Sequence, residues 1–230
     1  RGELTPAEQD EIVANIVAFA PDVIAYAEGE LFEDAFVEPI ERRWKGGHRP
    51  FYVSEGPPQN EKLKALIGTS AERRHRFLAV DYPANSDENF RFTLHYNEEF
   101  TPKITPGMAP GTIYDAFYVA AFAASAAPAG PLDGVQLAEA MARLGRDGSR
   151  VSVGPSNIFQ AYEVLRGGQK LHLVGAGSDL DLDPATGEIP NDFAVYCFGV
   201  DAAGRVSEPI ESGLRFDHRE KRIVGASRCP

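Results

Sequence analysis

The sequence predicts an α/β fold built around a parallel sheet, and three observations support this prediction. Short apolar runs typical of buried strands recur along the first hundred residues, helical patterns lie between them, and the loops that join them are brief. Strands that alternate with helices in this way form βαβ units, in which helices cover both faces of a parallel sheet. A hydrophobic content of 43% with 25% charged residues is typical of a globular protein.

The first part of the chain carries most of this pattern. A helix is expected to begin at Thr5, which can cap it, with proline in the first turn and Glu8 completing a capping box. Strands are predicted at residues 23–26, 51–53 and 77–80, and helices near residues 32–44, 61–67 and 85–100.

Prolines and glycines between residues 102 and 111 indicate a connector, after which the pattern changes. We expect a strongly apolar helix over residues 112–127, a helix over 133–144 and a helical stretch over 156–165. Short, turn-rich strands follow, then a strand over residues 193–200 that ends in a tight turn at 201–204.

Charge and cysteine usage limit the function. A net charge of −11 argues against nucleic acid or an anionic membrane as partner, because both require basic patches. No apolar run approaches the length of about 20 residues that a transmembrane helix needs. Cys197 and Cys229 would be unpaired thiols in a cytosolic protein, whereas in an exported protein they can form a bridge that holds the C-terminal tail.

Several motifs are explained better by structure than by chemistry. Asp179, Asp181 and Asp183 suggest a calcium loop, but proline occupies the positions where an EF-hand needs glycine and glutamate, so we favour a β-turn and expect no metal. The run Gly175-Ala-Gly177 lacks the third glycine of a phosphate loop, and no cofactor is expected.

Two loops are the best candidates for a binding site. Glu28-Gly29-Glu30 and Ser54-Glu55-Gly56 each follow a short buried strand, and open parallel sheets bind ligands beyond the carboxyl ends of their strands. The alternative is that the loop acids are solvated and that Glu55 favours the N-terminus of a following helix. We therefore predict Glu28, Gly29, Glu30, Ser54 and Glu55 as ligand-binding residues.

The succession of motifs resembles the type I periplasmic binding proteins, specifically the substrate-binding proteins of branched-chain amino-acid ABC transporters. The runs at residues 21–24, 50–56 and 77–80 are similar to the second lobe of this family. Tyr114-Asp115-Ala116, at the start of an Ala-rich helix, resembles the family's Tyr-Asp-Ala helix, and residues 175–187 resemble its Gly-Ala-Ser-Gly turn and the hairpin that follows. The resemblance extends from about residue 6 to residue 206.

The resemblance implies a fold of two doubly wound lobes that close on a solute. Residues 1–103 and 196–230 would form lobe two, and residues 104–195 the closing part of an incomplete lobe one. In the family's amino-acid binders an acidic residue at the position of Glu55 holds the ligand ammonium. Where some members carry an aromatic residue, this chain has Gly29 flanked by acids.

The implied function is capture of a small polar ligand, an amino acid or a related compound, without catalysis, for an ABC transporter permease or a sensor. The protein would be periplasmic or lipid-anchored outside the cytoplasmic membrane, with a signal peptide and a first lobe upstream. Because the apolar helix at residues 113–127 would otherwise expose a large apolar patch, we expect the missing N-terminal half or a neighbouring chain to cover it.

Two other functions stay open at this point. An α/β enzyme acting on a small polar substrate would use Glu55 as acid or base, and would need a second group such as His75 or His95 within hydrogen-bond reach of that substrate. A domain kept for protein contacts, with a degenerate cleft, is the third possibility.

Overall fold

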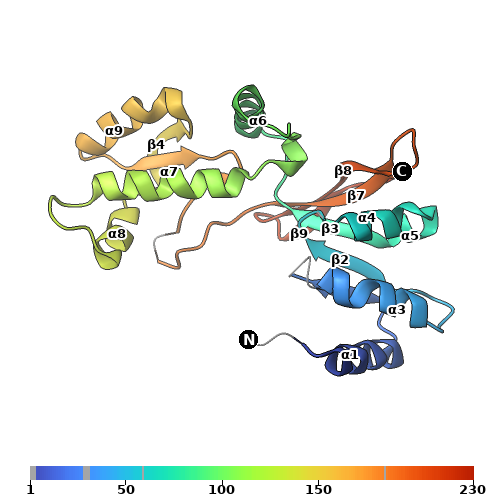
Figure 1. The fold of residues 1–230 in the computed structure, drawn as a ribbon. Coiled ribbons are helices and arrows are strands. Elements are labelled where there is room, and N and C mark those ends of the chain that lie inside the picture. The colour runs from blue at the N-terminus through green and yellow to red at the C-terminus, as the bar shows by residue number, and fades with distance from the viewer. Residues whose placement is uncertain (1–3, 28–31, 59, 184) are drawn as a thin grey trace. The chain divides into compact units, whose positions relative to one another are not determined.

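The chain, described here by a computed structural model over residues 4–27, 32–58, 60–183 and 185–230, divides into two compact units (Figure 1). The first unit comprises Arg1–Asp81, Phe193–Arg215 and Ile223–Pro230, and the second comprises Tyr82–Asp192 and Phe216–Arg222. Among the described residues, no helix has the length and apolar character needed to span a membrane.

The first unit carries a six-stranded sheet in the order β1-β2-β3-β7-β8-β9. In chain order its elements are α1 (Pro6–Phe19), β1 (Val23–Tyr26), the π-helix η1 (Glu33–Val37), α3 (Glu38–Arg43), β2 (Phe51–Glu55), α4 (Glu61–Gly68), α5 (Ala71–Arg76), β3 (Phe77–Asp81), β7 (Phe193–Val200), β8 (Val206–Asp217) and β9 (Arg222–Gly225).

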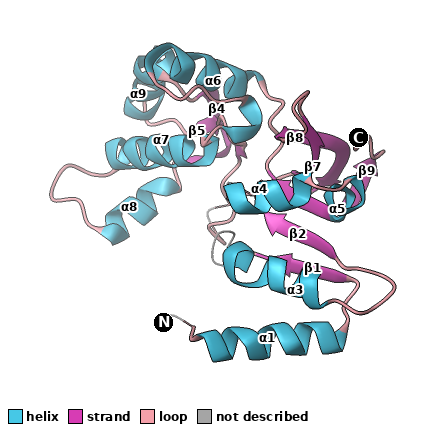
Figure 2. Cartoon of the chain, turned by 45° about the vertical axis from the view of Figure 1, so that its right-hand side comes forward, coloured by secondary structure: helices cyan, strands magenta, loops and turns pink. Residues whose placement is uncertain are grey.

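The register of this sheet shows the predicted parallel core. β1 pairs with β2 and β2 with β3 in parallel, whereas β7 runs antiparallel to β3. Helix α3 lies alongside β1 and β2 (Figure 2). The α/β fold class is therefore confirmed, with the addition that strands from the C-terminal part of the chain make the sheet mixed.

Helix α1 begins where its local sequence predicts. The Thr5 hydroxyl accepts a hydrogen bond from the Glu8 amide at 3.3 Å, and the Glu8 carboxylate accepts one from the Thr5 amide at 2.7 Å. This capping box satisfies two amides that the first helical turn leaves without intrahelical partners. Such caps fix helix boundaries locally, which explains why this boundary could be read from the sequence.

The second unit combines a three-stranded sheet, in the order β4-β5-β6, with four α-helices. Its described elements are α6 (Asp87–Glu99), the 3₁₀ turn η2 (Pro106–Met108), α7 (Gly111–Ala126), α8 (Gly134–Met141), β4 (Leu144–Ser152), the 3₁₀ turn η3 (Pro155–Asn157), α9 (Ile158–Arg166), β5 (Leu171–Val174) and β6 (Asp179–Leu180).

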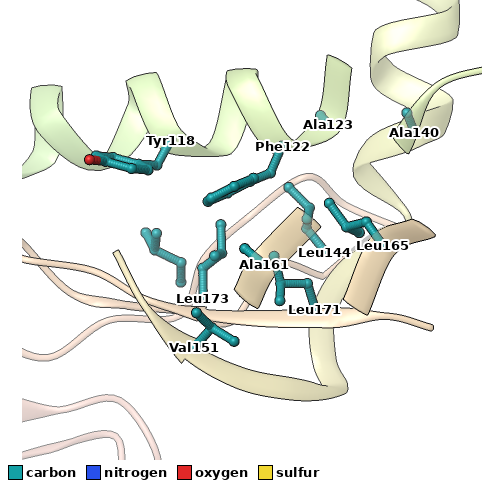
Figure 3. Packing of buried hydrophobic residues seen from close by; sticks show 11 residues of the cluster. Tyr118, Phe122, Ala123, Ala140, Leu144, Val151, Ala161, Leu165, Leu171 and Leu173 are labelled. Atoms are coloured by element: carbon teal, nitrogen blue, oxygen red, sulfur yellow. The ribbon is translucent and has the colours of Figure 1, made fainter. Parts of the chain in front are cut away.

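The core of the second unit lies between α7 and the β4–β5 pair. Figure 3 shows Tyr118 and Phe122 directed from α7 toward Leu171, Leu173 and Val151 on the strands, and all five side chains are buried. β5 is buried along its whole length, and its one polar residue, His172, lies 2.9 Å from Asp179.

The secondary structure differs from the sequence-based expectation in several places. The helix predicted over residues 133–144 ends at Met141, and Leu144 begins β4 instead. The short helix α5 and the long strand β8 were not predicted. The polar, proline- and glycine-containing sequence of β8 hides its strand character, which depends on pairing with the rest of the sheet.

The compact units do not end where the predicted lobes do. Helix α6, which falls within the predicted lobe two, belongs to the second unit. Ser152 donates a hydrogen bond to Glu88 on α6 at 2.9 Å, and the ring centroids of Phe92 and Tyr114 are 4.6 Å apart. The assignment of residues 1–103 with 196–230, and of 104–195, to two lobes stays a prediction.

Candidate functional site

The carboxyl ends of β1, β2 and β3 lie side by side in the first unit. Tyr26 pairs with Ser54, and Glu55 pairs with Val80, so these strand ends share one edge of the sheet. Ser54 and Glu55 are the last two residues of β2 rather than part of the loop that follows it. The predicted site residues Glu28, Gly29 and Glu30 lie outside the described residues.

A surface depression of about 370 Å³ opens at these strand ends. Glu55 is exposed and supplies the only charge among the described residues that line it, while most of the lining is apolar. Ligand sites generally combine an apolar lining with a few placed polar groups. The lining residues are Ala25, Tyr26, Ala27, Val53, Ser54, Glu55, Val80 and Phe193.

Behind this edge lies a buried polar group that sequence reasoning missed. Glu33, at the start of η1, has only 4% of its surface exposed and accepts a hydrogen bond from the Tyr26 hydroxyl at 3.3 Å. Burial, together with the charge of Glu33, raises the pKa of Tyr26 far above its ordinary value, so the phenol stays protonated.

The position of Ser54 and the turn after it are fixed by the backbone. The Ser54 hydroxyl donates to the carbonyl of Gly56 at 2.8 Å. Gly56 has a φ of 73°, in the left-handed region that glycine adopts without a steric penalty. This turn ends β2 directly after Glu55 and leaves the carboxylate exposed at the sheet edge.

A buried ion-pair network holds β2 against its neighbouring helices. Two guanidinium nitrogens of Arg76, on α5, each donate to one carboxylate oxygen of Glu41, on α3, at 2.9 Å. Tyr52, on β2, donates to the same carboxylate at 3.2 Å. Burial alone would raise the pKa of Glu41, but Arg76, aided by Arg49 and Tyr52, holds it below its ordinary value.

The second unit contains a buried carboxylate, Asp115, where the segment at residues 114–116 contacts the turn at residues 175–177. Asp115 is 2% exposed and accepts hydrogen bonds from the amides of Ala176 and Gly177, both at 2.7 Å. Burial raises the pKa of Asp115 to about 6, although these backbone donors oppose the shift. The glycine run therefore brings backbone amides close to a carboxylate of α7.

The close approach at this turn explains its glycines. A side chain at Gly175 would overlap the Asp115 carboxylate, and one at Gly177 would lie 2.9 Å from the amide of Thr112. The close approach to Asp115 and Thr112 is sufficient to explain the glycines of Gly175-Ala-Gly177.

The acidic run at residues 179–183 is partnered by protein groups. Asp179 lies 2.9 Å from Nε2 of His172, Asp181 pairs with Arg146, and the Asp183 carbonyl accepts from the Gly187 amide at 2.8 Å in the predicted turn. Among the described residues, no group of His, Cys, Asp and Glu side chains is arranged to hold a metal ion.

The two cysteines form a disulfide, which the sequence offered as one of two alternatives. A disulfide joins Cys197, on β7, to Cys229, with the Cα atoms 5.8 Å apart. The bridge holds the C-terminal segment against the sheet of the first unit, and the Arg228 amide donates to the carbonyl of Ser212 beside it.

The two histidines proposed as partners of Glu55 in an enzyme lie on different helices, and only His75 belongs to the same unit as Glu55. His75 lies on α5, just before the amino end of β3, whereas Glu55 pairs with Val80 toward the carboxyl end of that strand. His95 is exposed on α6 in the other unit, where its Nδ1 lies 3.3 Å from Glu98. Within the first unit, His75 and Glu55 are therefore at opposite ends of the strands.

Helix α7 shows the expected division between a packed and an uncovered face. Tyr118, Phe122 and Ala123 are buried in the core, while Ile113 and Phe117 have 74% and 69% of their surface exposed. Apart from the buried Asp115, this helix carries no charged residue. Its outer face is thus an exposed apolar surface, of a kind that usually marks an interaction site.

Comparison with known protein families finds no match, and comparison with curated proteins finds none either. Among solved structures, the chain is similar to a solute-binding protein of an ABC transporter from Rhodopseudomonas palustris BisB5, determined in complex with 3,4-dihydroxybenzoic acid. The identity is 14% and the TM-score 0.47. The similarity covers 96% of this chain but 49% of the other, so this chain spans about half of that protein's length.

Proposed function

We propose that this chain is part of an extracytoplasmic solute-binding protein that captures a small polar ligand for an ABC transporter or a sensor. The observation that carries the proposal is the depression at the aligned carboxyl ends of three strands, with Glu55 exposed at its rim. The order of sequence motifs supports it independently. Glu55 is the only charged residue among the described residues that line the depression, and this apolar lining favours binding over catalysis.

The residues of the depression suggest the kind of ligand. Glu55 offers a carboxylate that can bind an ammonium group, and Ala25, Val53 and Val80 offer a small apolar surface. An amino acid or a related compound combines these two features. The loop at residues 28–30 follows β1 along the chain and is part of the proposed site on the strength of the resemblance.

A thermal-shift screen of the protein against amino acids, amides, polyamines and aromatic acids tests the proposal. A ligand present at about 100 times its Kd adds about 2.7 kcal/mol to the unfolding free energy, which raises the melting temperature by several degrees. We expect Glu55→Gln to abolish the shift, and Glu11→Gln, an exposed acid on α1, to leave it unchanged.

Three results would contradict the proposal or its assignment of Glu55. Absence of any stabilising compound across the four classes would remove the binding function, and an equal shift in the Glu55→Gln variant would remove Glu55 from the site. A hit among aromatic acids alone would also contradict a role for Glu55 in holding a cation, since a carboxylate repels an anionic ligand.

We also propose that the exposed face of α7, defined by Ile113 and Phe117, is covered in the intact protein. The family resemblance names the N-terminal half as the cover, and a neighbouring chain is the alternative. Light scattering separates them: a stable dimer that Phe117→Ser dissociates supports the neighbouring chain. A clean monomer rules out the neighbouring chain. In that case a separately expressed N-terminal half should bind this chain, and loss of that binding in the Phe117→Ser variant supports the N-terminal half as the cover.

A further inference from the structure

Two basic segments meet at the amino-terminal edge of the sheet in the first unit. Residues 41–50 lead into β2 and residues 71–76 lead into β3, and together they hold seven Lys and Arg side chains against two Glu. Because β2 and β3 are parallel neighbours, with Tyr52 opposite Phe77, both segments enter the sheet at the same edge. Figure 1 shows the loop before β2 at the same end of the sheet as α5. This basic edge is opposite to the carboxyl ends of the strands, where Glu55 lies.

Ion pairs confirm that the two segments are in contact and leave positive charge in excess. Arg49 lies 3.2 Å and Arg73 3.5 Å from one oxygen of the buried Glu41 carboxylate. Arg76 pairs with the same carboxylate at 2.9 Å and with Glu72 at 2.6 Å. Two carboxylates therefore face three guanidinium groups. The net charge of −11 is a sum over the whole chain, and it hides this local basic edge.

Part of the positive charge is at the surface. Lys45 is exposed in the turn before β2, and Arg74 is half-buried and donates to the carbonyl of Gly68. Neither has a carboxylate partner among the residues that the structure describes. Asp22, exposed before β1, subtracts one charge from the edge. Acids elsewhere on the chain act weakly on a surface that touches this edge, because the Debye length at physiological salt is about 8 Å.

An exposed aromatic side chain lies at the same edge. Phe19 is the last residue of α1 and is 81% exposed. The chain then enters β1 at Val23, which pairs with Phe51, the first residue of β2. The end of α1 is therefore beside the entry to the parallel strands. Basic residues next to an exposed aromatic ring are typical of protein surfaces that lie in the headgroup region of a bilayer.

We propose that this basic edge binds the anionic headgroups of a phospholipid bilayer, with Phe19 entering the headgroup region. A bilayer attracts basic side chains that come near it without any shaped pocket, with about a fivefold gain in affinity for each. An acidic protein surface would be held mainly by buried aromatic anchors, and Trp44, the single aromatic residue of the two segments, is already buried in the protein.

The test is co-sedimentation of the whole chain with vesicles of equal parts phosphatidylglycerol and phosphatidylcholine. We expect binding at low salt, release by added sodium chloride, and no binding to vesicles of phosphatidylcholine alone. Replacing Lys45 and Arg74 together by glutamine should weaken binding about 25-fold. The matched control replaces Lys62 and Arg166, whose side chains are 85% and 81% exposed, and should change binding less than twofold although the net charge is the same.

A second pair of variants tests the aromatic contact. Phe19→Ser should weaken binding at least about fivefold, because the ring loses its apolar environment in the bilayer. Phe159→Ser removes a ring that is 82% exposed on α9, and should leave binding unchanged. Urea midpoints of all variants, followed by Trp44 emission, check that the first unit is folded. If the double variant does not fold, Lys45→Gln alone carries the test, with an expected loss of about fivefold.

The outcomes decide between the possible partners. Absence of binding to the anionic vesicles, equal binding to neutral vesicles, or equal loss in the two double variants would each overturn the proposal. Binding to poly-glutamate without binding to vesicles would overturn it as well, and would assign the edge to an acidic protein. The vesicle assay contains no solute, so a thermal-shift screen without hits would remove the proposed function and leave this inference in place.

Discussion

Replacing Glu41 by glutamine should destabilise the first unit strongly, because it removes the counter-charge of a buried arginine. The side chains of Glu41 and Arg76 are 4% and 7% exposed, and two parallel hydrogen bonds of 2.9 Å join them. Glutamine can accept only one of these bonds, and its amide group then faces a guanidinium N–H. The substitution is nearly isosteric, so packing should change little.

The expected magnitude follows from what Arg76 retains. Loss of one partner from a buried ion pair costs about 3–5 kcal/mol. Arg76 keeps its bonds to Glu72 at 2.6 Å and to the carbonyl of Pro50 at 2.9 Å. We therefore expect a loss near the lower limit, about 3 kcal/mol. Glu72 is 65% exposed, so Glu72→Gln should cost less than about 1 kcal/mol.

Urea denaturation followed by tryptophan fluorescence measures this difference. Trp44, the single tryptophan of the chain, is buried at the end of α3 and reports on the first unit. A cost below about 1 kcal/mol for Glu41→Gln, or an equal cost for the Glu41 and Glu72 variants, would show that the buried pair does not stabilise the unit as argued.

The pH dependence supplies a second measurement on the same residue. The pKa of Glu41 is lower in the folded protein than its ordinary value of 4.5, because Arg76 outweighs the effect of burial. A group of this kind contributes stability above its unfolded pKa and loses it as the pH falls through the folded pKa. The unfolding free energy reported by Trp44 should therefore decline below pH 4.5, and Glu41→Gln should flatten that decline.

Three further predictions concern the second unit and the disulfide. Asp115→Asn should destabilise the second unit by about 2–3 kcal/mol, because the amide N–H of asparagine would face a backbone N–H. Amide hydrogen exchange at pH 7.5 measures this loss. The control Asp133→Asn keeps a good helix cap and should have little effect. Gly175→Ala should lower the unfolding free energy by at least about 2 kcal/mol, because the added methyl group would overlap the Asp115 carboxylate. In the control Gly134→Ala the added methyl group meets open space. Equal stabilities of the two variants would contradict the close approach at Gly175. Cys197→Ser should lower the unfolding free energy measured in urea by about 3–4 kcal/mol, as expected for a closed loop with a sequence separation of 32. An unchanged urea midpoint would mean that the bridge does not constrain the unfolded chain.

The elements that could be predicted are those whose signals are local. The capping box at Thr5 and the short apolar runs of β1, β2 and β3 depend on neighbouring residues, and the structure places them within one or two positions of the prediction. Strand β4 is different. Leu144 and Ser149 both lie opposite Leu171, so the residues between them bulge out of the pairing. A polar insertion of this kind interrupts the strand pattern in the sequence.

The candidate site shows the same division. The strand-end rule singled out Ser54 and Glu55, because a parallel sheet places all its carboxyl ends at one edge. Glu33 resembles a surface acid at the start of a helix, and only its contact with Tyr26 shows that it is buried. The pairing of Glu41 with Arg76 joins residues 35 positions apart, so no local pattern announces it.

The exposure of Glu55 follows from the packing of the residues before it. Side chains alternate across a strand, so Tyr52 and Ser54 point to one face of β2 and Glu55 to the other. Tyr52 is completely buried, stacked on Phe77 at 4.4 Å and bonded to Glu41, which commits that face to the core. A slip of one residue would bury Glu55 and expose Ser54. The ion-pair network behind the sheet therefore sets which polar group reaches the depression. If the depression binds a ligand as proposed, a variant that loosens Tyr52 should weaken that binding although Tyr52 does not line the depression.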